Sequence, residues 1–179
     1  MGLERALFLD RDGVINHDAG YTSKPEDFVF IDGIFDLCRA AQRKGYILIV
    51  VTNQAGIGRG YYTEKDFLNL TVWMIDQFKS EGIELSDVFF CPFHPECGVG
   101  KYKKDSPNRK PNPGMLLQAN TKYGLALDES IMIGDKESDM LAAYRAGINR
   151  RWHYVNRDAS FSKFATYSLR SLWDGIELL

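Results

Sequence analysis

Short apolar runs alternate with longer amphipathic segments along most of this chain. Five runs are too short for a buried helix and are rich in β-branched or aromatic residues, so we expect them to be strands: Ala6–Leu9, Ile47–Val51, Val88–Phe90, Ile131–Ile133 and Trp152–Val155. Such alternation predicts a mostly parallel sheet with helices on both faces. The expected fold class is therefore α/β.

The first segment between two of these strands has the spacing of a helix. Its apolar residues fall at helical intervals and share one face: Ile34, Leu37, Cys38 and Ala41. Asp32 is the expected N-cap, and Gly45 is the expected residue just after the C-terminus. The spacing predicts a helix over 34–44.

Four more helices are expected further along the chain. Thr63 begins one that continues to Gly82, with Asp66 three residues later as a variant of the capping box. The others are expected from near Pro113 to before Gly124, from Ser138 to Ala146, and over Leu172–Leu179.

The length and organisation of the chain predict one domain over 1–179. Its 179 residues match one ordinary domain of about 100–200 residues. No repeat or low-complexity linker separates two cores. Residues 91–111, rich in Gly, Pro, Lys and Asp, lack periodicity and are expected to form a long loop inserted after the third strand. Loops of this length in compact domains are usually functional or mobile.

The charge balance and the cysteine count exclude several classes of protein. A formal net charge of −2 gives no basic tract for nucleic acid or an anionic membrane surface. Glu4 and Arg5 precede the first apolar run, unlike a signal peptide, and no apolar stretch is long enough to span a bilayer. Three cysteines do not make a disulfide scaffold. We expect a soluble cytoplasmic protein with no nucleic-acid or membrane partner.

Polar residues follow three of the expected strands and end the long loop. They form four groups: Asp10-Arg11-Asp12-Gly13, Thr52-Asn53-Gln54, Arg109-Lys110-Pro111, and Gly134-Asp135-Lys136 with Asp139 one helical turn later. Ligands of parallel sheets bind outside the carboxyl ends of the strands. We therefore expect these groups to converge on one crevice.

The chemistry of these four groups indicates phosphoryl transfer. Clustered carboxylates repel one another unless a cation lies among them, and oxygen ligands of this kind suit Mg²⁺ shared with a phosphate. A phosphoryl group in transfer needs a metal, a lysine and hydrogen-bond donors around it. A carboxylate can also attack phosphorus directly. Each motif alone is more often a turn, a strand exit or a solvated pair, but the four together favour the functional interpretation.

The same residues resemble the four motifs of haloacid dehalogenase superfamily phosphatases. The motifs are Phe8–Val14, Val51-Thr52-Asn53, Lys110-Pro111 and Gly134-Asp135. The longer strings Asp10–Asn16, Thr52–Gly60 and Arg109–Met115 resemble the heptose bisphosphate phosphatase group, whose pattern histidinol-phosphate phosphatases largely share. No large insertion follows the first motif or lies between Thr52 and Lys110. The resemblance implies a capless haloacid dehalogenase fold, a Rossmann-like three-layer sandwich with a mostly parallel central sheet.

This resemblance implies roles for the catalytic and metal-binding residues. Asp10 would be the nucleophile that takes the phosphoryl group, and Asp12 would act as general acid and then as general base. Mg²⁺ would be held by the carboxylates of Asp10 and Asp135 and by the backbone carbonyl of Asp12. Thr52 would donate a hydrogen bond to a phosphoryl oxygen, and Lys110 would balance its charge.

The resemblance also implies a set of substrate-binding residues. Asn53 and Arg109 would contact the substrate, and the planar fork of the Arg109 guanidinium suits a second phosphate. Lys136 and the loop from Asp18 to Tyr21 would complete the wall of the site.

The implied activity is Mg²⁺-dependent removal of the 7-phosphate from D-glycero-D-manno-heptose 1,7-bisphosphate. The reaction would pass through an aspartyl phosphate and supply nucleotide-activated heptose for cell-surface glycans such as lipopolysaccharide. Two alternatives remain open: a histidinol-phosphate phosphatase, and a non-catalytic protein that binds sugar phosphates. The expected partner is a small sugar phosphate, and the expected state is a monomer.

Cys91, His94 and Cys97 in the long loop invite a zinc interpretation. Related enzymes hold a structural zinc with a Cys-x-His pair and a Cys-x-Cys pair. Here Phe93 stands where the histidine would be, and Ser106-Pro107-Asn108 replaces the second pair. Structural zinc needs four ligands, so we expect a zinc-free loop with reduced thiols.

A glycine-rich segment and two histidines are expected to have structural rather than catalytic roles. The spacing of Gly56, Gly58 and Gly60 does not match a nucleotide-binding loop and indicates a flexible turn near the crevice. Neither His17 nor His153 has a visible partner, and both are expected at solvated or core positions.

Overall fold

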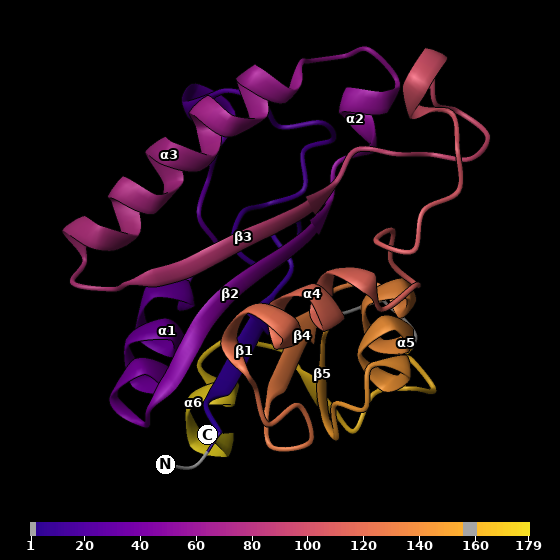
Figure 1. Cartoon of the computed structure of the whole chain (residues 1–179). Helices are drawn as coiled ribbons and strands as arrows, with labels where there is room; N and C mark the ends of the chain where they lie inside the picture. Colours follow the sequence, from indigo (N-terminus) through magenta and orange to yellow (C-terminus); the bar gives the residue numbers. More distant parts are fainter. Residues whose placement is uncertain (1–2, 156–160) are drawn as a thin grey trace.

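A six-stranded parallel sheet runs through the middle of the protein (Figure 1). The computed structural model describes residues 3–155 and 161–179. The strands are β1 (Arg5–Leu9), β2 (Tyr46–Asn53), β3 (Leu85–Cys91), β4 (Ile131–Gly134), β5 (Arg150–Tyr154) and β6 (Tyr167–Leu169). Their order is β3-β2-β1-β4-β5-β6, and each neighbouring pair is parallel. The predicted α/β class with a mostly parallel sheet is confirmed.

Helices and turns connect these strands. The α-helices are α1 (Ile34–Arg43), α2 (Ala55–Gly58), α3 (Glu64–Ser80), α4 (Gly114–Tyr123), α5 (Glu137–Arg145) and α6 (Asp174–Leu178), with two short 3₁₀ turns, η1 (Pro25–Asp27) and η2 (Gly100–Tyr102). All five predicted strands and all five predicted helices are present, with ends that differ by a few residues. Strand β6 and helix α2 were not predicted, because three or four residues are too few to show a period.

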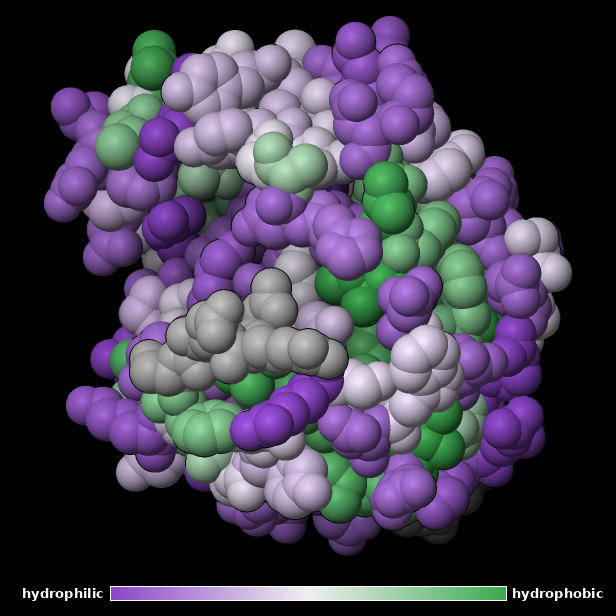
Figure 2. Space-filling view, turned by 180° about the vertical axis from the view of Figure 1, so that it is seen from behind, coloured by the Kyte–Doolittle hydropathy of each residue, from purple (hydrophilic) through white to green (hydrophobic). Residues whose placement is uncertain are grey.

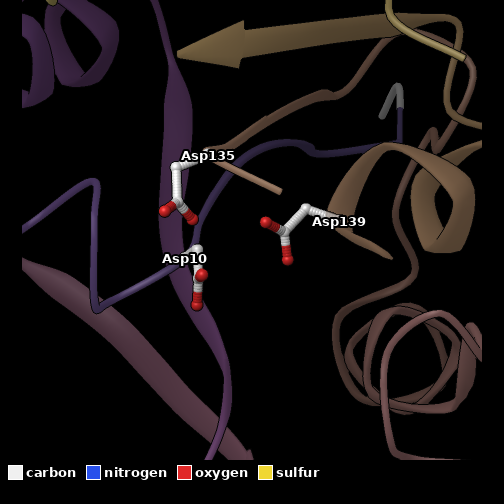
Figure 3. A group of neighbouring side chains, drawn as sticks. All are labelled: Asp10, Asp135 and Asp139. Atoms are coloured by element: carbon white, nitrogen blue, oxygen red, sulfur yellow. The ribbon is translucent and has the colours of Figure 1, made fainter. Parts of the chain in front are cut away.

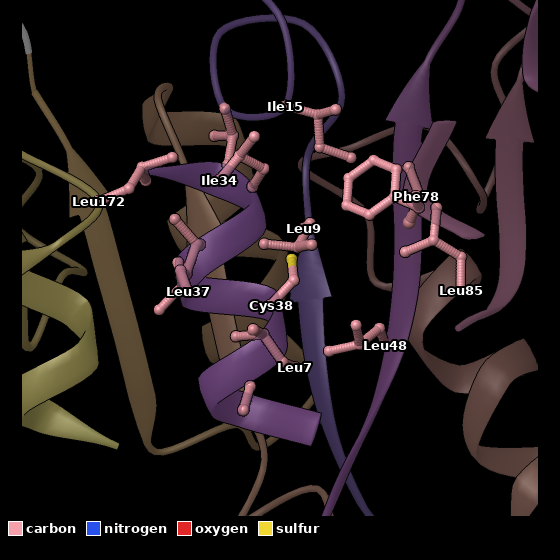
Figure 4. Close-up of a cluster of buried hydrophobic side chains, with 14 of the residues drawn as sticks. Leu7, Leu9, Ile15, Ile34, Leu37, Cys38, Leu48, Phe78, Leu85 and Leu172 are labelled. Carbon is pink, nitrogen blue, oxygen red and sulfur yellow. The ribbon is translucent and has the colours of Figure 1, made fainter. Parts of the chain in front are cut away.

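Two hydrophobic clusters cover opposite faces of the sheet. Side chains alternate along a strand, so Leu7 and Leu9 of β1 face one layer while Ala6 and Phe8 face the other. The first layer contains α1, α3 and α6, and Figure 4 shows its side chains gathered around Leu9. The second layer contains α4 and α5. The result is the expected three-layer sandwich.

The helix ends follow the sequence in most places and differ in one. Thr63 and Asp66 make the predicted capping box at the start of α3, each accepting a hydrogen bond from the other's backbone N–H. The predicted N-cap of α1 was wrong: Gly33, not Asp32, precedes the helix. The chain turns there with φ 87° at Gly33, where Trp173 packs against the Cα, and this turn suits a glycine.

The long loop after β3 has its own contacts with the body. Val99 N–H donates to the carbonyl of Gly58 (2.8 Å), and the Tyr102 hydroxyl donates to Glu64 Oε1 at the start of α3 (2.5 Å). Within the loop, His94 N–H donates to the Tyr102 carbonyl (3.1 Å). These contacts hold the loop beside α2, as the top of Figure 1 shows.

Two features of the fold bear on the other sequence expectations. The connections where a cap domain would be inserted, residues 11–33 and 92–113, contain only loops, η1 and η2, which fits the capless type. Among the helices of residues 3–155 and 161–179, none is long and apolar enough to cross a membrane. The single domain over 1–179, the cytoplasmic location and the absence of nucleic-acid partners stay predictions.

Candidate active site

The carboxyl ends of β1 and β2 open into a cleft of about 320 Å³. Most of the predicted site residues line it: Asp10, Asp12, Asp18, Tyr21, Thr52, Asn53, Lys110 and Lys136. Asp135 and Arg109 lie outside that lining. From behind, the space-filling view shows hydrophilic residues around a hollow in the surface (Figure 2). The sequence groups at three strand ends and at the end of the loop therefore meet at one edge of the sheet, as expected.

Three carboxylates form the centre of the site. One oxygen from each of Asp10, Asp135 and Asp139 lies within 4.8 Å of the others, and Figure 3 shows the three side chains gathered close together. Asp10 and Asp139 are buried and Asp135 is half-buried. Burial, together with the neighbouring carboxylates, raises the pKa of Asp10 to about 7 and the pKa of Asp135 to about 6. The cluster resists ionisation unless positive charge is supplied.

Lys110 supplies part of that charge from inside the protein. Its Nζ lies 2.9 Å from Asp10 Oδ1 and 2.7 Å from Asp139 Oδ1, and it donates to the carbonyl of Val51 (2.8 Å). Burial alone would lower the pKa of Lys110, but the two carboxylates outweigh it and raise this pKa. The lysine stays charged and links β2 with the two acidic groups.

The remaining carboxylate oxygens fit a divalent cation. Asp135 Oδ1 is buried and makes no hydrogen bond. Asp139 is less available, because both of its oxygens have a partner: Lys110 contacts Oδ1 and the Lys136 N–H donates to Oδ2 (3.0 Å). The partners of Asp10, Lys110 and the Arg11 N–H, both lie at its Oδ1. Asp10 and Asp135 are therefore the side chains suited to hold a cation, and hard oxygen ligands favour Mg²⁺ or Ca²⁺ over softer metals.

Two glycines allow the carboxylates to come this close. A Cβ at Gly13, where φ is 95°, would lie 2.2 Å from Asp135 Oδ2. A Cβ at Gly134 would lie 2.2 Å from the Cβ of Asp139. Any other residue at either position would displace a side chain of the acidic cluster.

Asp12 has hydrogen-bond partners of its own beside this cluster. Arg11 Nη2 (2.7 Å) and Asn16 Nδ2 (3.1 Å) donate to Asp12 Oδ1, and Gln54 Nε2 donates to Oδ2 (3.0 Å). The Arg11 side chain is 2% exposed. No role was predicted for Arg11, Asn16 or Gln54 from the sequence, although each lies inside a motif. The signal that could have identified Arg11 was its place as a charged residue in a segment that is otherwise buried.

Asn53 holds the backbone of Lys110 in place. Its Nδ2 donates to the Lys110 carbonyl and its Oδ1 accepts from the Lys110 N–H, both at 3.0 Å. The two bonds tie the end of β2 to the end of the long loop. Asn53 also lines the cleft, so the predicted contact with substrate stays a prediction beside this structural role.

Lys136, Asp18 and Tyr21 form the rim of the cleft. Lys136 Nζ lies 3.0 Å from Asp18 Oδ2 and 3.8 Å from Asp135 Oδ2. Burial would raise the pKa of Asp18, but the hydrogen bond and charge of Lys136 lower it. Tyr21 is partly exposed, has a positive φ of 57°, and packs edge-on against Tyr61 (4.6 Å between ring centres).

Arg109 and the cysteines of the long loop lie apart from the acidic cluster. Arg109 Nη1 donates to the carbonyl of Phe93 (3.3 Å), and partial burial lowers the pKa of its guanidinium. Cys91 is buried and Cys97 is exposed, while His94 Nδ1 already accepts from the N–H groups of Glu96 and Cys97. In the described ranges these loop residues form no metal-ligating group. The zinc-free loop stays a prediction.

His153 has a defined place that the sequence did not reveal. It is buried, its Nδ1 accepts from the N–H of Ser162 (3.2 Å), and its Nε2 lies 3.0 Å from the carbonyl oxygen of Asp135. Because Nδ1 is an acceptor, Nε2 carries the hydrogen and donates to Asp135. His153 takes the buried one of its two expected positions, solvated or core, and its partners left no local signal because they lie 9 and 18 residues away in sequence.

The fold and the site together define a hydrolase of the haloacid dehalogenase (HAD) type. The HAD-hydrolase-like family model matches residues 107–151. A HAD-like phosphatase from Mesorhizobium loti has a TM-score of 0.88 and 37% identity, covering 98% of this chain and 85% of its own. D,D-heptose 1,7-bisphosphate phosphatase from B. bronchiseptica, complexed with magnesium and phosphate, has a TM-score of 0.82 and 23% identity, with 97% of each chain covered.

Curated relatives narrow this class to one family. D-glycero-α-D-manno-heptose-1,7-bisphosphate 7-phosphatase from Burkholderia mallei is 56% identical over 87% of this chain and 82% of its own length. D-glycero-β-D-manno-heptose-1,7-bisphosphate 7-phosphatase from Vibrio cholerae is 47% identical over 82% of this chain and 78% of its own length. The chain belongs to the family of D-glycero-D-manno-heptose-1,7-bisphosphate 7-phosphatases.

Proposed function

We propose that this protein is a Mg²⁺-dependent phosphatase that removes the 7-phosphate of D-glycero-D-manno-heptose 1,7-bisphosphate. The observation that carries the proposal is the placement of Asp10, which is buried between Lys110 and Asp135 at the carboxyl end of β1. The family membership supplies the substrate class. The product would be heptose 1-phosphate for nucleotide-activated heptose biosynthesis.

In the first step, Asp10 attacks the phosphorus of the 7-phosphate. A bond forms between an Asp10 carboxylate oxygen and phosphorus, and the bond from phosphorus to the C7 oxygen breaks. Asp12 gives its proton to that departing oxygen, so the sugar leaves as an alcohol. Lys110 and the Thr52 hydroxyl balance the charge that spreads over the phosphoryl oxygens.

In the second step, water hydrolyses the aspartyl phosphate. Asp12, now a carboxylate, takes a proton from the attacking water as its oxygen bonds to phosphorus. The bond between phosphorus and Asp10 breaks, which releases inorganic phosphate and restores both carboxyl groups. The hydrogen bonds from Arg11, Asn16 and Gln54 fix Asp12 for both proton transfers.

Asp10 and Asp135 would hold Mg²⁺ through their carboxylates, and the Asp12 carbonyl would be a third protein ligand. When bound, Mg²⁺ neutralises the carboxylate cluster and polarises the phosphoryl group. The unpaired, buried Asp135 Oδ1 and the raised pKa values of both carboxyl groups support this assignment.

The rest of the substrate would contact the rim of the cleft. Asp18, Tyr21, Asn53 and Lys136, which line the cleft, would bind the sugar. Arg109, from outside that lining, would bind the phosphate that is not cleaved. The active unit would be a monomer. A cytoplasmic location remains part of the proposal.

The test is a kinetic comparison with Mg²⁺ present. Phosphate release is measured on both anomers of the heptose bisphosphate and on histidinol phosphate. We expect kcat/KM to be higher for one of the bisphosphate anomers. A higher value for histidinol phosphate would reverse the assignment, and binding without turnover of any ester would indicate a sugar-phosphate-binding protein.

A further inference from the structure

The side-chain amide of Gln54 joins two groups of the proposed reaction. Its Nε2 donates one hydrogen to Thr52 Oγ1 (2.8 Å) and the other to Asp12 Oδ2 (3.0 Å). Gln54 is 1% exposed, so water does not compete for these bonds. Both hydrogens of the amide are used, and its oxygen must face the opposite side.

On that opposite side, Tyr62 donates its hydroxyl hydrogen to Gln54 Oε1 (2.5 Å). Burial raises the pKa of Tyr62 to about 12, so the phenol keeps its proton at neutral pH. The amide of Gln54 therefore has a partner for its oxygen and for both of its hydrogens.

Gly56 fixes the position of the Tyr62 ring. A Cβ at Gly56 would lie 2.3 Å from Cε1 and 2.7 Å from Cζ of Tyr62, so the ring rests directly on the backbone of α2. This contact explains why residue 56 is a glycine, which the sequence alone did not explain. The hydroxyl of Tyr62 is held in place by packing as well as by its hydrogen bond.

The direction of these bonds decides what Thr52 can do. Because Thr52 Oγ1 accepts from Gln54, its own hydrogen is left to donate into the cleft. If the amide were reversed, its oxygen would accept the Thr52 hydrogen and would also face the carboxylate of Asp12, with repulsion between the two oxygens. The Tyr62 donor opposes that reversal.

We propose that Tyr62 is a positioning residue of the phosphatase, acting through Gln54 to orient the Asp12 carboxyl toward the departing oxygen of the substrate. The inference rests on the proposed function, since it assigns a purpose to groups of that reaction. Tyr62 transfers no proton and forms no bond to substrate. Its hydrogen bond sets the orientation from which Asp12 protonates the departing oxygen.

The choice of leaving group gives a specific test. An alkyl phosphate, such as the heptose bisphosphate, needs the Asp12 proton on its departing oxygen, whereas p-nitrophenyl phosphate releases a stable phenolate without it. For Tyr62→Phe we expect kcat on the alkyl ester to fall about 10-fold, the effect of one lost hydrogen bond, with KM changed less than about two-fold. The loss on p-nitrophenyl phosphate should be less than about three-fold.

Two further variants serve as a matched control and as a second way of displacing the Tyr62 hydroxyl. Tyr123→Phe removes the phenol hydrogen bonds to the Ser86 carbonyl and to Asp87 Oδ2 at the far edge of the sheet and should leave both rates unchanged. Gly56→Ala pushes the Tyr62 ring while keeping its hydroxyl, and its Cβ would also lie 2.9 Å from Cδ1 of Tyr21 at the rim. The loss in kcat that depends on the leaving group should be reproduced, and a change in KM is assigned to Tyr21. Melting temperature and circular dichroism verify that each variant is folded.

Each outcome decides the inference. A larger loss on the alkyl ester in both Tyr62→Phe and Gly56→Ala supports it. Equal losses on the two esters, or full activity in folded Tyr62→Phe, would overturn it while leaving the proposed function intact. Wild-type protein that hydrolyses neither ester would overturn the proposed function, and this inference with it.

Discussion

Lys110 and Asp139 form an ion pair inside the protein, with Nζ 2.7 Å from Oδ1 and both side chains at most 3% exposed. The same ammonium lies 2.9 Å from Asp10. Asp139 therefore fixes the lysine, and the lysine serves the carboxylate at which we place the chemistry. The pair joins the end of the long loop to the start of α5.

Lys110→Met should destabilise the protein and nearly abolish activity. Removing the cation leaves two buried carboxylates unpaired, and breaking a buried pair costs about 3–5 kcal/mol. The matched control is Lys122→Met, which removes an exposed ion pair with Asp87 and should cost less than about 1 kcal/mol. Chemical denaturation measures both free energies of unfolding. Similar small losses in the two variants would contradict the account.

The metal-free protein should lose stability as the pH rises from about 4 to about 8. Asp10 and Asp135 have pKa values raised to about 7 and about 6 in the fold, from 3.8 for an ordinary aspartate. A raised pKa means that the folded state binds the proton more tightly, so this stabilisation is present at low pH and lost as pH rises through the folded pKa.

Mg²⁺ should reverse this loss, because it binds the ionised carboxylates in competition with protons. The rise in melting temperature on adding Mg²⁺ should therefore be larger at pH 8 than at pH 5.5. Asp135→Asn should reduce the Mg²⁺ response and part of the pH dependence. A Mg²⁺ response that is larger at pH 5.5 would refute this assignment of the carboxylates.

Gly13→Ala should disrupt the acidic cluster, whereas Gly147→Ala should cost only backbone strain. Both glycines have positive φ, 95° and 84°, but only at Gly13 would a Cβ meet a side chain, Asp135 Oδ2 at 2.2 Å. Gly147 has open space, so its variant should lose about 1–2 kcal/mol and keep full activity. Activity and melting temperature separate the two cases. Normal activity in Gly13→Ala would show that Asp135 need not lie where we place it.

His153→Ala should weaken Mg²⁺ binding by about three-fold, because its hydrogen bond holds the backbone of Asp135 and so acts only indirectly on the carboxylate that we place on the metal. The imidazole donates to the Asp135 carbonyl and is itself held by Ser162. His153→Gln can restore a donor at that place and should recover part of the affinity. Calorimetric titration with Mg²⁺ measures the constant directly. Unchanged affinity in folded His153→Ala would remove His153 from the metal site.

Local patterns in the sequence were enough for the main strands, the long helices and the four motifs. The apolar run before Asp10 and the capping box at Thr63 are signals contained in a few neighbouring residues. Convergence of the motifs followed from one rule of parallel sheets.

The missed features depend on residues that are distant in sequence. Three such contacts form only when the strands lie beside one another: the hydrogen bond from Gln54 to Asp12, the packing of Tyr62 on Gly56, and the hydrogen bond from His153 to Asp135. At the N-cap of α1, a Cβ on Gly33 would lie 3.1 Å from Trp173, a neighbour 140 residues away that gives no local signal. Contacts between side chains that are distant in sequence cannot be predicted from the residues next to them in a single sequence.

The most direct test of the central claim is to find the phosphoryl group on Asp10 during turnover. Wild-type protein is mixed with heptose bisphosphate and Mg²⁺, quenched in acid within milliseconds, and digested for mass spectrometry. We predict one phosphoryl group on the peptide that contains Asp10, and neither this adduct nor phosphate release in folded Asp10→Asn. A phosphoryl group on another residue, or phosphate release by Asp10→Asn at the wild-type rate, would contradict the account.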